Sequence, residues 1–205
     1  MSQPPERTGS PPAPWKYGQL SEAELYWRDR QPWLEEHGYM LRPRYRPDWT
    51  PSWEGTSESH FMCEDGRRLI HPHILDATRV SDGTVVTLKK IDNSVHPYEV
   101  EIARMFCTEP LKLDPRNHCV QIIEVLQDPK EEAASIIVMP FLKTYNKPRF
   151  DTIGEALEFF HQALEGLQFM HENRVAHRLQ RYLSPQCDDG PAAALRPQAI
   201  SPVKC

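Results

Sequence analysis

The sequence predicts an α+β fold, in which a small antiparallel sheet with one helix is followed by a long amphipathic helix. Residues 84–91, 120–126 and 134–139 are rich in β-branched and apolar side chains, as strands are. From residue 153 to residue 170 the apolar side chains instead recur at steps of three and four, which is the period of one helix face. The strand signals therefore come first and the best helix signal comes last.

Turn signals and one short helix separate the three predicted strands. Residues 81–83, Ser-Asp-Gly, form a turn before the first strand, and the polar residues 127–132 join the other two. Alternation along the first strand puts four side chains on one face, namely Val85, Thr87, Lys89 and Ile91. Residues 98–106 suit a helix with its apolar positions at Val100, Ala103, Met105 and Phe106.

Two capping boxes predict where helices begin. Ser21 with Glu24 predicts a short helix that ends near Pro32, and Thr152 with Glu155 predicts the start of the long helix. Asn173 should end the long helix, because asparagine tolerates the left-handed conformation, and residues 174–176 should form a short strand.

The chain ahead of the sheet divides into a leader and an arm. Residues 1–19 are rich in Pro, Ser and Gly and are expected to be disordered. Residues 20–60 hold the short helix and a Pro/Trp-rich arm, whose prolines favour extended backbone over residues 41–53. Tyr45, Trp49 and Trp53 alternate with arginines and could stack on single-stranded nucleic acid. We favour the simpler interpretation, in which these aromatic side chains pin the arm onto the domain.

Charge and cysteine content exclude several classes of protein. The 205 residues carry 24 basic and 29 acidic side chains, a net charge of −5, which disfavours nucleic-acid binders and anionic-membrane binders. Five scattered cysteines without a C-x-x-C pair suggest neither a disulfide framework nor a zinc site. His71 and His73 lack a third ligand, so we interpret them as part of a proline-broken loop. With no apolar run long enough to span a bilayer, we expect an intracellular protein, cytoplasmic or nuclear.

Three motifs occur in one order along residues 76–178. Residues 86–89 read Val-Thr-Leu-Lys on the first strand, and Glu101 comes later on the predicted helix. Residues 136–142 read Ile-Ile-Val-Met-Pro-Phe-Leu, and residues 164–171 and 175–178 read Leu-Glu-Gly-Leu-Gln-Phe-Met-His and Val-Ala-His-Arg. This series resembles the eukaryotic protein kinases, in particular the divergent kinase-like proteins expanded in filamentous fungi. The resemblance makes residues 61–178 a partial kinase domain: the N-lobe, the hinge and the first long helix of an incomplete C-lobe.

The resemblance also implies roles for individual residues. Lys89 would reach the α and β phosphates of ATP, paired with Glu101, or with Glu99 in an alternative register. Thr87 would stand on the cleft face beside Lys89, and Met139 would be the gatekeeper. Backbone groups of Pro140 and Leu142 would meet the adenine, and Mg²⁺ would accompany the nucleotide. His177 and Arg178 would be the remnant of the His-Arg-Asp catalytic motif.

The departures from the kinase pattern are as informative as the matches. Leu179 stands where a kinase has its catalytic aspartate, and residues 71–80 contain no glycine where the phosphate-covering loop should lie. We therefore expect a protein kinase family member, a Ser/Thr kinase by ancestry, that is truncated before the catalytic aspartate and inactive as written. The alternative is a non-catalytic module that binds a partner protein. In either case the long helix, without its lobe, should expose an apolar stripe.

Residues 179–205 differ in composition from the rest of the chain and show no apolar period. When the codons for residues 179–190 are re-read from the second base, allowed codons give a run that includes Asn-Val-Met-Met-Asp. That run resembles the residues that come after His-Arg-Asp in the fungal kinases. We expect that a frame change or a misplaced splice junction after Arg178 replaced the catalytic half with an unrelated, disordered tail.

Overall fold

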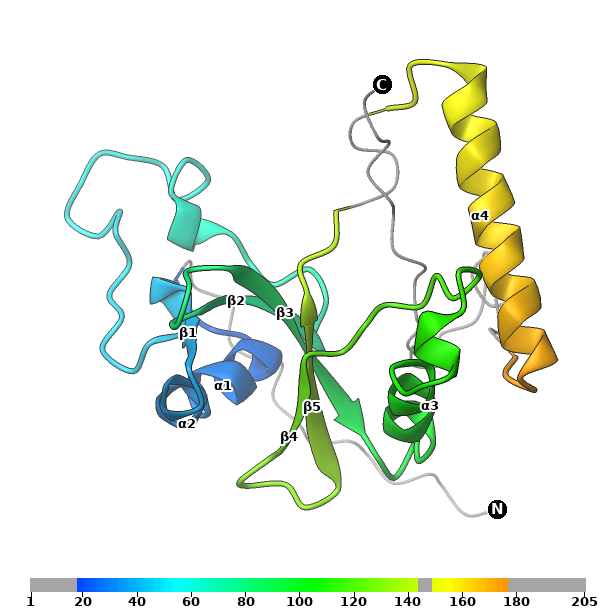
Figure 1. Cartoon of the computed structure of the whole chain (residues 1–205). Coiled ribbons are helices and arrows are strands. Elements are labelled where there is room, and N and C mark those ends of the chain that lie inside the picture. The colour runs from blue at the N-terminus through cyan, green and yellow to red at the C-terminus, as the bar shows by residue number, and fades with distance from the viewer. Residues whose placement is uncertain (1–17, 144–148, 177–205) are drawn as a thin grey trace, which may run out of the picture.

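The computed structural model describes residues 18–143 and 149–176, and these form an α+β fold around one antiparallel sheet (Figure 1). The helices are α1 (Glu22–Arg28), α2 (Gln31–Glu36), α3 (Glu99–Phe106) and α4 (Ile153–Glu172). The strands are β1 (Tyr39–Leu41), β2 (Ile74–Arg79), β3 (Val85–Asp92), β4 (Glu124–Gln127) and β5 (Ala134–Pro140). Three short 3-10 turns complete the elements: η1 (Pro43–Tyr45), η2 (Glu64–Gly66) and η3 (Leu111–Leu113).

The five strands form one curled sheet in the order β1-β2-β3-β5-β4, and every neighbouring pair is antiparallel. The turn at residues 81–83 works as predicted, because Gly83 takes a positive φ of 71° between β2 and β3. Curling brings the two edge strands together, so that the Tyr39 hydroxyl on β1 donates to the Glu124 carboxylate on β4. This hydrogen bond closes the ends of the sheet toward each other.

Each face of the sheet buries its own apolar cluster. One face carries Val86 and Leu88 of β3 and packs against side chains of the N-terminal helices and the arm, including Trp27, Leu34 and Tyr45. The other face carries Ile91 and Ile137 and packs against Ala103 of α3. The period-two alternation predicted for residues 84–91 is therefore confirmed on both faces.

A third cluster joins α4 to the rest of the structure. Phe169 and Met170 in the C-terminal half of α4 pack against Phe106 and Cys119. Figure 1 shows that half, in orange, beside α3, whereas the N-terminal half, in yellow, stands clear of the sheet. The predicted apolar stripe is exposed over residues 153–164, at Ile153, Leu157, Phe160 and Leu164.

Several expectations at the N-terminal end are corrected. The Ser21–Glu24 capping box is present, but the helix ends at Arg28, and Pro32 lies in the first turn of a second helix, where its missing N–H costs nothing. The arm is not wholly extended, since Pro43–Tyr45 is a 3-10 turn, and just before it Tyr39–Leu41 is a strand that was not predicted. Residues 20–60 thus supply part of the sheet and much of its core.

Strand β2 was not predicted, although Leu75 and Ala77 alternate into the core. It begins at Ile74, so His71 and His73 lie ahead of it in a turn, in agreement with the interpretation of these two residues. Past α4, residues 174–176 form no strand, and the left-handed residue is Arg174, with φ 60°, instead of Asn173. The leader up to residue 17 and the tail from residue 177 lie outside the described residues.

Candidate functional site

Lys89 and Glu99 form the ion pair around which the candidate site is built. Lys89 lies on β3, and Glu99 is the first residue of α3, where a carboxylate also complements the positive end of the helix. The lysine ammonium donates to the Glu99 carboxylate, and the two side chains are only 8% and 9% exposed. Because the pair is so little hydrated, each charge depends on the other for its stabilisation.

The partner of Lys89 is therefore Glu99, the alternative register, and not Glu101. Glu101 lies two residues farther along α3, on the exposed side of the helix. A step of two residues turns a helix side chain through more than half a circle, so only one of the two carboxylates can face the sheet. Glu99 and Glu101 both lie in the first turn of α3, and the sequence pattern does not indicate which of them faces the sheet.

Thr87 and Met139 share the sheet face that carries Lys89. They are directly opposite each other on β3 and β5, and both are half-buried. Pro140 opposes the fully buried Val86, so it belongs to the other face of the sheet, and β5 ends at this residue. Leu142 lies beyond the end of the strand and is half-buried. The structure thus brings Lys89, Thr87 and Met139 to one face and leaves Pro140 and Leu142 at the strand end.

Asp76 on β2 is a residue of this face that the sequence analysis missed. It is directly opposite Thr87, and its carboxylate accepts from Arg42 at 2.9 Å. The signal was the alternation Ile-Leu-Asp-Ala-Thr over residues 74–78, which was obscured by the preceding His-Pro-His. Arg42 also binds Glu64 at 3.1 Å, so the ion pairs here join two cations to three carboxylates.

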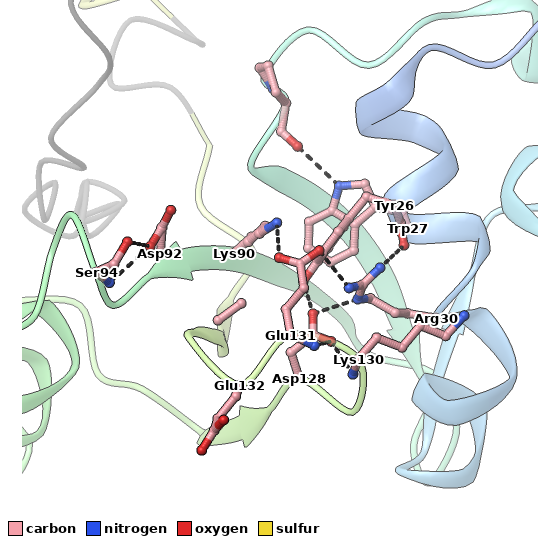
Figure 2. A network of polar contacts seen from close by, with 12 residues as sticks. Tyr26, Trp27, Arg30, Lys90, Asp92, Ser94, Asp128, Lys130, Glu131 and Glu132 are labelled. Atoms are coloured by element: carbon pink, nitrogen blue, oxygen red, sulfur yellow. Dashed lines mark hydrogen bonds and ion pairs between the residues drawn. The ribbon is translucent and has the colours of Figure 1, made fainter.

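The opposite face of β3 holds a second polar network, centred on Asp128 in the turn between β4 and β5 (Figure 2). Asp128 accepts from the Tyr26 hydroxyl and from Arg30, each at 2.5 Å, and its side chain is fully buried. Arg30 also binds Glu131 at 2.9 Å, and Glu131 in turn accepts from Lys90 at 2.8 Å. The network ties the junction of α1 and α2 to β3 and to the β4–β5 turn.

The electrostatics of Asp128 follow from these contacts. Burial raises the pKa of its carboxyl, but the hydrogen bonds from Arg30 and Tyr26 outweigh burial, so the pKa lies below the usual value. Burial and the adjacent Asp128 carboxylate both raise the pKa of the Tyr26 phenol. Lys90 lies 3.9 Å from the centre of the Tyr26 ring and adds a cation–π contact. Asp128 is thus a charged anchor at neutral pH.

A similar anchor holds the arm. Glu24 accepts from Arg44 at 2.9 Å, and these side chains are 1% and 3% exposed. Arg44 also donates to the carbonyl of Asp65, whose carboxylate accepts from Trp49 and from Ser52. These contacts match the favoured interpretation of the arm, in which aromatic side chains pin it to the domain.

Some of the predicted site cannot be placed. His177 and Arg178 lie outside the described residues, as does Leu179. Within residues 18–143 and 149–176, no three His, Cys, Asp or Glu side chains are grouped as a metal site requires. In the same part of the chain, no helix is both long and apolar enough to cross a membrane.

Comparison with known proteins adds no relative. No protein-family model matches the chain, and no curated protein matches it significantly. The chemistry of this face must therefore be argued from its own residues.

Proposed function

We propose that this chain is a protein kinase-like module that keeps the lysine–carboxylate pair of a nucleotide site but does not transfer phosphoryl groups. The observation that supports the proposal is the ion pair between Lys89 on the third strand and Glu99 on the next helix. In protein kinases a lysine on the third strand binds the ATP phosphates while a glutamate of the next helix holds it in place. The same residue types on the same successive elements are present here.

The absence of transfer follows from Leu179. In a kinase the aspartate after His-Arg orients the substrate hydroxyl and accepts its proton. The isobutyl side chain of Leu179 can do neither. A retained site would therefore position ATP without a route to a Ser or Thr hydroxyl.

Nucleotide binding by this module is weak. Residues 74–79 form a regular strand, and residues 71–80 contain no glycine with which to cover the phosphates. Beside Thr87, a base would meet the Arg42–Asp76 ion pair instead of an apolar surface. Lys89 is left as the main phosphate ligand, with Mg²⁺ carried by the nucleotide.

A ligand-induced thermal shift tests the proposal. Millimolar Mg-ATP should raise the Tm of the full chain, and Lys89→Met should abolish that rise. The matched control is Lys112→Met, an exposed lysine on η3, which should keep it. Because Lys89→Met also removes an ion pair, the quantity compared is the shift with ligand in each variant and not the Tm itself. Equal shifts in Lys89→Met and Lys112→Met would contradict the proposal.

The second candidate function is a non-catalytic module that binds a protein partner. One observation favours it, namely that four large apolar side chains of α4 are each more than half exposed: Ile153, Leu157, Phe160 and Leu164. The absence of any Mg-ATP shift in the wild-type chain would favour this function over the first.

A further inference from the structure

The loop that comes after η1 carries a row of aromatic side chains. The ring centres of Trp49 and Trp53 lie 6.1 Å apart, those of Trp53 and His60 also lie 6.1 Å apart, and those of His60 and Phe61 lie 3.8 Å apart. Trp49, Trp53 and His60 are half-buried, whereas Phe61 is 72% exposed. We call these four side chains the aromatic row. A contiguous group of rings that is partly open to solvent is typical of a binding surface.

The aromatic row is held in place by polar contacts of the arm. The Trp49 indole donates to the buried Asp65 carboxylate at 2.9 Å, and the Ser52 hydroxyl donates to the same carboxylate at 2.6 Å. The backbone amide of Thr56 donates to the Trp53 carbonyl at 3.1 Å and so closes a turn at this tryptophan. Because the surface is ordered in advance, a ligand that binds it pays little additional conformational entropy.

The N-terminal end of the described chain lies directly on the aromatic row. Gly18 is the first described residue, and a methyl group added to it would lie 3.2 Å from the Pro51 ring and 3.7 Å from the Trp53 ring. Its φ of 94° is in the left-handed region, which glycine adopts and other residues resist. The backbone at Gly18 is thus packed against the row, so the residues that precede it begin within reach of these rings.

We propose that the aromatic row binds a polyproline segment, and that its occupant is residues 11–17 of the same chain. These residues read Pro-Pro-Ala-Pro-Trp-Lys-Tyr. Prolines fix the polyproline II backbone before binding, and surfaces lined with aromatic rings recognise that backbone. Seven residues in this conformation reach about 20 Å, which is enough to follow the row from Trp53 to Phe61.

The order of residues in this segment suits a polyproline helix, which has three residues per turn. Residues three apart share one edge of such a helix. Two of its three edges carry only proline and aromatic side chains: Pro11, Pro14 and Tyr17 on one edge, and Pro12 and Trp15 on the other. The third edge holds Ala13 and Lys16. The apolar edges can therefore face the aromatic rings while the lysine stays in water.

Charge also favours this occupant. From residue 7 to residue 17 the chain has two bases, Arg7 and Lys16, and no acid. The loop that carries the row has four acids from residue 54 to residue 66 and no Lys or Arg. Glu54 and Glu58 of this loop are exposed. Attraction between exposed charges is weak, so it guides the segment to the row, whereas contacts with the rings hold it there.

Trypsin tests the proposal, because the leader has one cleavage site inside the proposed segment and one outside it. In the folded full chain, cleavage after Lys16 should be slow and cleavage after Arg7 fast, since a protease needs the backbone released from its surface. A synthetic peptide of residues 1–20 gives the intrinsic ratio of the two rates. Mass spectrometry of the early products should show a Lys16-to-Arg7 ratio at least about fivefold lower in the chain than in the peptide.

Variants on the two sides of the contact make the test specific. Phe61→Ser removes a ring from the row, and alanine at Pro11, Pro12 and Pro14 together removes the preformed backbone. Each variant should raise the cleavage ratio about fivefold, toward that of its own peptide. The matched control is Leu113→Ser, a residue of η3 that is 69% exposed, and it should keep the wild-type ratio. Circular dichroism checks that each variant is folded.

Four outcomes overturn the proposal. A wild-type ratio equal to that of the peptide shows that nothing holds the segment. Equal ratios in Phe61→Ser and Leu113→Ser place the contact away from the row. A triple alanine variant that keeps the wild-type ratio shows that the polyproline backbone is not what is recognised. Protection that disappears on dilution from about 50 μM to about 0.5 μM chain means that residues 11–17 occupy the row of a second copy.

Discussion

Lys89 and Lys90 are neighbours on β3, yet they belong to ion-pair networks on opposite faces of the sheet. Lys89 binds Glu99 on the α3 face, whereas Lys90 binds Glu131 on the face covered by the N-terminal helices. Alternation along a strand separates them, so each has its own carboxylate. Lys89 and Lys90 are the same residue type, so it is the contacts of Lys89 that make it the candidate.

The first prediction distinguishes the two acids of α3. Glu99→Gln should lower the free energy of unfolding by about 3 kcal/mol, because it leaves the Lys89 ammonium buried without a counter-charge. Glu101→Gln makes the same chemical change on an exposed part of the same helix and should stay within about 0.5 kcal/mol of wild type. Urea denaturation at neutral pH measures both. Equal losses in the two variants would mean that Glu99 is not the partner of Lys89.

At the scale of elements, the packing of α4 against the segment between η3 and β4 depends on a close contact at Gly166. A methyl group at this position would come within 3.2 Å of the His118 side chain, which is tighter than ordinary van der Waals contact. The His118 ring is held in turn by a hydrogen bond with the carboxylate of Glu165, which lies on α4 beside Gly166. Glycine at residue 166 is thus a packing requirement, although it disfavours the helix locally.

The second prediction compares two glycines of α4. Gly154→Ala should stabilise the chain by about 0.5 kcal/mol, because alanine favours a helix and the nearest atom, the Thr152 hydroxyl oxygen, is 3.7 Å away. Gly166→Ala should lose this gain and destabilise by about 1 kcal/mol through overpacking against His118. Thermal unfolding measures both variants. A gain in Gly166→Ala as large as that in Gly154→Ala would show that this packing is loose.

The elements themselves were largely predictable from the sequence. Capping residues marked the starts of α1 and α4, and β-branched runs marked β3 and β5, because these signals are local. Strand β2 was missed since its polar Asp76 and Thr78 lie on the more open face, which gave it too little apolar content. β1 was missed because three residues are too few to show a period.

For the molecule as a whole, buried carboxylates hold the N-terminal segment together and fasten it to the sheet. Asp128 binds Arg30, Glu24 binds Arg44, and Asp65 binds Ser52 and Trp49. In each carboxyl, burial raises the pKa, but hydrogen bonds outweigh burial and leave the pKa below its usual value. The ionised forms are therefore the ones that stabilise the fold.

The third prediction is a loss of stability in acid. A carboxyl with a depressed pKa in the folded state contributes stability that is fully present above its unfolded pKa, about 4, and that is lost as the pH falls through the folded pKa. The free energy of unfolding should therefore fall as the pH drops below about 4. Asp128→Asn should cost about 3 kcal/mol at neutral pH and make the acid slope shallower.

Urea denaturation across a pH series measures this effect, with Asp48→Asn as the control because Asp48 is exposed. The control should keep both the stability and the slope of the wild type. An acid slope in Asp128→Asn as steep as in the wild type would show that this carboxyl does not anchor the segment.

The sequence by itself determined the fold class, the starts of the capped helices and the set of candidate residues, because propensity, capping and alternation act over a few positions. It also shows that Leu179, and not an acid, comes directly after His177 and Arg178. Only the tertiary structure decided that Glu99, and not Glu101, meets Lys89, that Asp76 joins their face, and that the N-terminal segment completes the core. Those outcomes depend on which elements pack together across long separations in the chain, and no local pattern records that.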